Sequence, residues 1–149
     1  MSEGVSSIGS CIAFSATLPA DEAIATYEAL TWTDSGEAIT LGDIGPENAV
    51  ITYDTVCDGI VNKRMGSTNY GQQAMEFAYV SSNAAQVILS AAVRNKSKIA
   101  ARETLPTGDV IYYSGYVAKA KQMTGGAGDI LKLSVSFEID GATVEDLAA

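Results

Sequence analysis

Residues 131–140 read LKLSVSFEID, and apolar and polar side chains alternate along them at every position. Successive side chains of a β-strand point to opposite faces, so this pattern predicts a strand with one face in the core and the other polar. The core face would hold Leu131, Leu133, Val135, Phe137 and Ile139. Such a one-sided strand is typical of an antiparallel sheet with one covered face.

Similar strand signals recur along the chain. They lie at residues 10–18 (SCIAFSATL), 48–56 (NAVITYDTV), 73–80 (QAMEFAYV), 97–105 (SKIAARETL) and 110–123 (VIYYSGYVAKAKQM). These segments alternate in polarity or are rich in β-branched and aromatic residues, which favour strands. Turn formers at 106–109 (PTGD) and 125–129 (GGAGD) separate the last strands. The sequence therefore predicts a mainly β, antiparallel fold.

One flanking α-helix is predicted over residues 82–94. Its apolar side chains recur every three or four positions, Ser81 or Ser82 supplies the N-cap, and Arg94 suits the last turn. A short helical turn within residues 21–30, with Asp21 near its start, is a second expectation. The length of 149 residues fits one domain, at 10–140, with arms at 1–9 and 141–149 that a partner would have to hold in place.

A long loop is predicted over residues 57–71. Gly59, Gly66, Asn69 and Gly71 favour turns, and they lie between the strand at 48–56 and the strand at 73–80. Those two strands would then be antiparallel neighbours. Because connections longer than five residues are often functional, we expect the loop to make a contact between subunits. The residues expected to make this contact are Lys63, Arg64, Met65, Asn69 and Tyr70.

Charge is distributed unevenly along the chain. The net charge is −9, and residues 1–62 hold ten acidic and no basic residues, whereas 63–149 hold eight acidic and nine basic ones. This balance disfavours DNA binding by a basic patch. The asymmetry suits head-to-tail association of identical subunits, in which unlike patches meet, with a basic cluster at Arg94, Lys96, Lys98 and Arg102. A solvated acidic face with an ordinary basic loop is the alternative.

The sequence offers little material for catalysis or for a cofactor. There is no histidine, and GGAGD lacks the lysine and hydroxyl of a phosphate-binding loop. Cys11 and Cys57 lie in strand-like segments and are expected to be buried free thiols. The N-terminus resembles no export signal, so we expect synthesis and assembly in the cytoplasm. We therefore expect no enzyme, cofactor or metal site.

Six segments taken in order resemble the major tail tube proteins of long-tailed, non-contractile bacteriophages. They are GSCIAFSATLP, KRMGSTNYG, QAMEFAYV, NAAQVILSAAV, DVIYYSGYVAKAKQ and LKLSVSFEIDG. The resemblance covers roughly residues 5–141 and depends on the order of the segments. Contractile tail tubes and type VI secretion tubes have related folds, so a sheathed tail stays open as an alternative.

The resemblance implies a β-sandwich or half-barrel flanked by a helix. It also implies a structural virion protein, assembled in the host cytoplasm, whose rings of six subunits stack into a hollow tail tube. DNA passes through the tube without specific binding, and the other partners are tail terminator, tape measure and baseplate or tip proteins. The long loop and the arms would join the rings.

Strand alternation gives candidates for the lining of the tube. Glu76, Glu138 and Asp140 lie on polar strand faces, and fixed negative charge would keep DNA from adhering. A different class of function is a small-ligand-binding β-barrel of lipocalin type, which the one-sided strands and seven tyrosines also suit.

Overall fold

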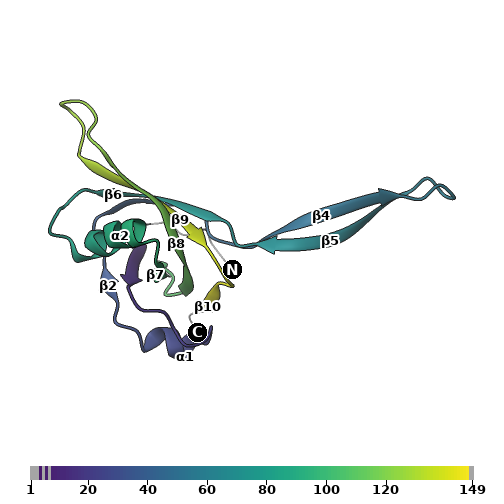
Figure 1. The fold of residues 1–149 in the computed structure, drawn as a ribbon, viewed down its shortest axis with the longest axis horizontal. Helices are drawn as coiled ribbons and strands as arrows, with labels where there is room; N and C mark the ends of the chain where they lie inside the picture. The colour runs from purple at the N-terminus through teal and green to yellow at the C-terminus, as the bar shows by residue number, and fades with distance from the viewer. Residues whose placement is uncertain (1–3, 5, 7, 148–149) are drawn as a thin grey trace.

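A computed structural model describes residues 4, 6 and 8–147 and shows a curved sheet from which a two-stranded hairpin projects (Figure 1). The elements are β1 (Cys11–Ser15), α1 (Ile24–Glu28), β2 (Thr33–Asp34), β3 (Ala38–Leu41), β4 (Glu47–Asp54), β5 (Val61–Asn69), β6 (Gln72–Ala78), α2 (Ala84–Asn95), β7 (Lys98–Thr104), β8 (Val110–Met123), β9 (Lys132–Ile139) and β10 (Val144–Asp146). The predicted mainly β, antiparallel class with a flanking helix is confirmed. Neither helix in the described part of the chain is long and apolar enough to cross a membrane.

Chain connectivity forces the main sheet to curve. Its strand order is β2-β1-β7-β8-β9-β6-β3, with β10 paired to β8, and every pairing is antiparallel. If the sheet were flat, six spacings of about 4.8 Å would place β2 and β3 about 29 Å apart. Only residues 35–37 connect these two edge strands, and that segment spans at most about 14 Å. The sheet therefore curls into a half-barrel with an open seam.

The interior of the half-barrel is filled by side chains. Phe14, Phe77 and Phe137 are fully buried and pack against Leu89 and Ala85 of α2 in one core cluster. On β9 the predicted alternation is confirmed, because Leu133, Val135, Phe137 and Ile139 are all buried. Leu131 precedes the strand and is 39% exposed.

Helix α2 matches the predicted helix at 82–94, but its cap differs. Asn83 is the N-cap, in place of Ser81 or Ser82, and its Oδ1 accepts hydrogen bonds from the amides of Ala85 and Gln86 at 3.0 and 3.2 Å. The side-chain Nδ2 of Asn83 also donates to the Ser35 carbonyl at 2.7 Å. This bond ties the helix to the segment that joins β2 to β3, which explains the preference for an amide cap.

The prediction of a loop at 57–71 was wrong over most of its length. Residues Val61–Asn69 form strand β5, which pairs with β4, while β6 pairs with β3 and β9. The strands before and after the segment are therefore not neighbours. The chain reverses near Asp58 and Gly59, where Gly59 has φ 65° and its amide donates to the Thr55 carbonyl at 2.9 Å.

The predicted C-terminal arm is partly a strand, and the predicted helical turn is a short helix. Residues 144–146 of the predicted C-terminal arm form β10 against β8, so this arm belongs in part to the sheet. Of the N-terminal arm only residues 4, 6, 8 and 9 are described, and the rest lies outside the described residues. The expected turn within 21–30 is confirmed as α1, preceded by Asp21, whose carboxylate accepts from Ala23 and Thr26.

Candidate assembly interface

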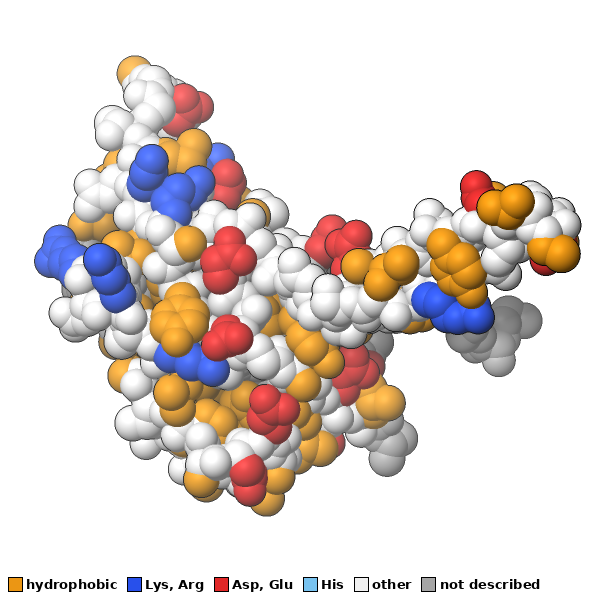
Figure 2. Space-filling view, turned by 45° about the vertical axis from the view of Figure 1, so that its right-hand side comes forward, with side chains coloured by type: hydrophobic (Ala, Val, Ile, Leu, Met, Phe, Trp, Pro, Cys, Tyr) orange, Lys and Arg blue, Asp and Glu red, His pale blue; other side chains and the backbone are white. Residues whose placement is uncertain are grey.

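The β4–β5 hairpin carries exposed apolar side chains that belong to neither core cluster of the described residues. Val50, Ile51, Tyr53, Val61 and Met65 are each 44–64% exposed, and neither core cluster includes a residue of β4 or β5. Figure 2 shows hydrophobic side chains along the projecting arm. An isolated two-stranded hairpin is marginally stable in water, and contiguous exposed apolar surface marks an interaction site.

Strand register divides the hairpin into two faces. Cross-strand partners share a face, so Lys63 lies with Val50, Thr52, Asp54, Val61 and Met65; we name this set the Lys63 face. Arg64 lies on the opposite face, with its guanidinium 5.7 Å from the ring centre of Tyr53. Its Nη1 also donates to the Lys63 carbonyl at 2.9 Å. Arg64 is thus engaged within the hairpin, whereas no ion pair holds the Lys63 ammonium among the described residues.

The remaining predicted contact residues lie in different settings. Met65 is 64% exposed on the Lys63 face. Asn69, at the end of β5, accepts a hydrogen bond from the Gly71 amide at 2.8 Å, and Tyr70 is partly buried against the main core. Tyr70 therefore anchors the base of the hairpin to the body.

The three candidate lumen acids lie on or beside the outer face of the sheet. Glu76 on β6 and Glu138 on β9 both point away from the core, and Asp140 follows β9. Glu76 lies 3.8 Å from Lys132, and Asp140 lies 3.2 Å from Lys98. The register places Lys119 and Lys121 opposite Ser136 and Ser134 on this same outer face, which is therefore mixed in charge.

Glu103 is a buried carboxylate that the sequence interpretation missed. It is 6% exposed, and burial raises the pKa of its carboxyl to about 6. It lines a groove of about 510 Å³ at the open seam, together with residues 8–10, strand β3 and Leu105; we name this the Glu103 groove. The signal was present, because Glu103 shares the strand parity of the buried Ile99 and Ala101. An acid that shares a strand face with core residues is a candidate functional residue.

Replacing Glu103 by glutamine is expected to stabilise the subunit at neutral pH. The carboxyl keeps its proton to a higher pH when folded than its ordinary 4.5, so folding stability falls as pH rises from 4.5 through about 6. Glutamine mimics the protonated form and avoids this loss. Glu103→Gln should therefore gain about 1–2 kcal/mol above pH 6 and almost nothing below pH 4.5, by urea unfolding. Glu138→Gln, on the exposed face of β9, is the control; equal pH profiles for wild type and Glu103→Gln would contradict the prediction.

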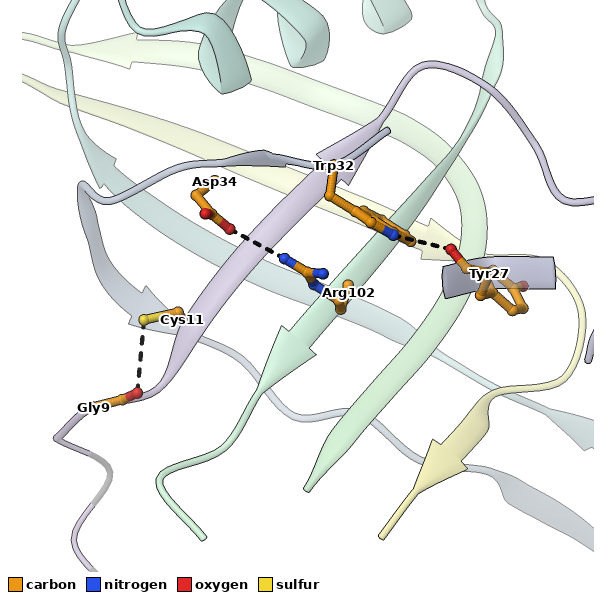
Figure 3. A network of polar contacts seen from close by, with 6 residues as sticks. All are labelled: Gly9, Cys11, Tyr27, Trp32, Asp34 and Arg102. Carbon is orange, nitrogen blue, oxygen red and sulfur yellow. Dashed lines mark hydrogen bonds and ion pairs between the residues drawn. The ribbon is translucent and has the colours of Figure 1, made fainter. Parts of the chain in front are cut away.

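The expected buried thiols and basic cluster are corrected by the structure. Cys11 and Cys57 are both free and exposed, because Cys11 lies on the outer side of β1 and Cys57 lies in the hairpin turn. The Cys11 thiol donates to the Gly9 carbonyl at 3.6 Å (Figure 3). Arg102 is no free cation: it pairs with Asp34 at 3.3 Å and lies 5.2 Å from the Trp32 ring centre, in the network of Figure 3. The Trp32 indole in turn donates to the Tyr27 carbonyl at 3.0 Å, which ties α1 to the residue that precedes β2.

Three structural neighbours share this fold at low sequence identity. A chain of the anti-feeding prophage baseplate has a TM-score of 0.71 and 11% identity, with 97% of each chain covered. The sheath/tube terminator of an extracellular contractile injection system also has a TM-score of 0.71, at 9% identity, covering 98% of this chain and 99% of that one. The SPP1 tail tube protein has a TM-score of 0.59 at 13% identity, covering 92% of this chain and 76% of that one. No curated protein sequence matches the chain.

The family model described as phage tail tube protein, TTP, matches residues 13–145, which run from within β1 to within β10. The match spans the curled sheet, both helices and the exposed hairpin. The chain belongs to the phage tail tube protein family, and its role is that of a structural tail tube protein.

Proposed function

We propose that this protein assembles into rings of six subunits that stack into a hollow virion tail tube, through which DNA leaves for the host. The observation that carries the proposal is the β4–β5 hairpin. Five of its apolar side chains are 44–64% exposed, and none of them joins a core cluster of the described residues. A second copy of the chain is the partner that a tube protein always has available.

Exposed strand edges of the main sheet give the subunit a second reason to associate. β2 and β3 end the strand order of the main sheet, so each has one edge without a strand partner among the described residues. Such edges are templates for pairing with another chain. Closure of a ring would cover them. The neighbours support six-fold assembly, since the anti-feeding prophage baseplate structure is 6-fold symmetrised.

The inner wall of the tube is proposed to include Glu76, Glu138 and Asp140. Fixed negative charge on the wall would keep the phosphate backbone from adhering during passage. The nearby lysines on the same outer face would offset part of that charge. An image reconstruction of assembled tubes tests both the six-fold symmetry and the placement of these acids, and acids on the outside would refute the placement.

Other tail components are proposed as partners at the ends of the tube. Structural neighbours include a terminating cap and a baseplate chain of the anti-feeding prophage. By analogy, terminator and baseplate or tip proteins would cap this tube and a tape measure protein would occupy it during assembly. We assign the chain no catalytic role.

The ligand-binding barrel is the weaker alternative. Phe14, Phe77, Phe137, Tyr113 and Leu89 each have 0% exposure and occupy the interior where a ligand would have to sit. A lipocalin-type site needs a cavity there.

Assembly should be salt-sensitive and should depend on the hairpin cations. We expect the purified protein to form rings or tubes as its concentration rises, and Lys63→Glu plus Arg64→Glu to raise the required concentration at least tenfold, since like charges then meet the acid-rich surface. Negative-stain microscopy and sedimentation measure this. Arg94→Glu plus Lys96→Glu makes the same change in net charge within the predicted basic cluster of the body, and a smaller effect of this variant would assign the contact to the hairpin. A protein that stays monomeric at every concentration and salt would refute the proposed function.

A further inference from the structure

Two charged side chains of the subunit have no ion pair among the described residues, one on the hairpin and one in the body. The first is Lys63, an exposed ammonium among the apolar side chains of the Lys63 face. The second is Glu103, a residue that is 6% exposed and whose carboxylate has no hydrogen bond or ion pair among the described residues. Each residue could supply the opposite charge that the other lacks.

The Glu103 groove has the shape and chemistry to take part of a strand. It holds about 510 Å³ and is bounded on one side by β3, whose second edge pairs with no strand in the described chain. Ile39 of β3 is 47% exposed, and Leu41 and Leu105 add apolar wall around the carboxylate. The groove combines apolar side chains with one acid and with the hydroxyls of Ser10 and Thr40. The Lys63 face likewise combines three apolar side chains with one base, Thr52 and Asp54.

The two surfaces belong to different parts of the molecule. The hairpin extends away from the sheet that carries β7 and Glu103 (Figure 1). Contact between Lys63 and Glu103 therefore requires two copies. The opposite hairpin face is less suited, because Arg64 already stacks near Tyr53.

We propose that the Lys63 face of the β4–β5 hairpin of one subunit docks in the Glu103 groove of a second copy of this chain, with the Lys63 ammonium beside the Glu103 carboxylate. This inference rests on the proposed tube function and names its subunit contact. The free edge of β3 offers backbone hydrogen bonds to the incoming strand. Apolar side chains of the Lys63 face cover Ile39, Leu41 and Leu105.

Burial of Glu103 in the free subunit makes the contact favourable. Most ion pairs lose in desolvation much of what they gain in attraction. Here the carboxylate is already desolvated by folding, so the incoming ammonium meets a preformed low-dielectric partner. This explains why an acid is kept at a position where it lowers the stability of the subunit.

A double-mutant cycle on the full-length protein tests the contact. Lys63→Gln and Glu103→Gln should each raise the concentration needed for tube formation about tenfold or more, because each leaves one charge unpaired at the interface. The double variant should need no higher a concentration for tube formation than the more impaired of the two single variants, since both partners of the contact are lost together. Arg64→Gln is the matched control, and its effect should simply multiply with that of Glu103→Gln. Light scattering and negative-stain microscopy at fixed salt give the readout.

The outcomes separate this inference from the proposed function. If Glu103→Gln assembles like the wild type, or if its effect multiplies with that of Lys63→Gln, the contact is refuted while the tube function stands. If the wild type itself never assembles, both fail. The expected gain in subunit stability of Glu103→Gln excludes misfolding as the cause of lost assembly, because a misfolded variant would unfold at lower urea.

Discussion

Removing the β4–β5 hairpin should abolish tube formation and leave the subunit folded. In this variant a short Asn-Gly turn replaces residues 47–69. Gly45 and Gly71 lie close enough for the replacement, since a Cβ built on Gly71 would be 3.9 Å from the Gly45 carbonyl oxygen. No core cluster contains a residue of β4 or β5, so the body loses no packing when the hairpin is removed. The loss of exposed apolar surface should also make the variant more soluble.

Thermal unfolding and sedimentation measure the two effects separately. We expect a melting temperature within a few degrees of the wild type and a monomer at concentrations at which the wild type forms tubes. Deleting residues 125–128 from the β8–β9 turn is the control, because it shortens another projecting connection of the same subunit. Tubes formed without the hairpin would show that the subunits join through the body alone.

The sequence predicted elements with one-sided burial from their periodicity, and it predicted the fully exposed β4 from its β-branched residues. Strand β9 follows its alternation, and α2 follows its three- and four-residue spacing, because in both cases one face packs in the core of the same chain. Strand β5 was missed for the opposite reason. Residues 61–69 are exposed on both faces, so they lack the apolar stripe that marks a strand, and Gly66 and Asn69 suggested a loop.

Pairing partners were less accessible to sequence interpretation than the elements themselves. β3 has four residues and β2 has two, too few for a periodic signal. Their placement at the two ends of the strand order follows from long-range packing and not from local propensity. The open seam between them, and with it the Glu103 groove, could therefore not be predicted.

The site residues divide in the same way. Lys63 and Arg64 were identified by their position after a base-free stretch, but only the register shows that they lie on opposite faces. Glu103 carried a usable signal in its parity with Ile99 and Ala101, and its burial confirms that the signal was informative. The charge of the proposed bore was oversimplified, because residues 119 and 121 come from a strand whose pairing with β9 was not predicted in register.

Substituting Gly115 by alanine should destabilise the subunit by about 3 kcal/mol or more, because the added methyl group has no space. Gly115 lies on β8 opposite Ile139, where β9 ends. A Cβ there would be 2.0 Å from the Glu138 carbonyl oxygen and 2.9 Å from its carbonyl carbon. These are backbone atoms held between β6 and β8 by strand pairing, so they cannot move aside as a side-chain end would.

Urea unfolding of Gly115→Ala against Gly128→Ala isolates this cause. Gly128 lies in the β8–β9 turn, where an added Cβ meets nothing within 4 Å, so its substitution should change stability by less than about 1 kcal/mol. Strain at Gly115 acts on the junction where β9 gives way to β10 along β8, next to the Asp140 amide that donates to the Ser114 carbonyl at 2.9 Å. Hydrogen exchange should therefore be fastest in β10 and the end of β9. An unchanged unfolding midpoint would mean that the strands separate there at little cost, and that the half-barrel is held by its core side chains alone.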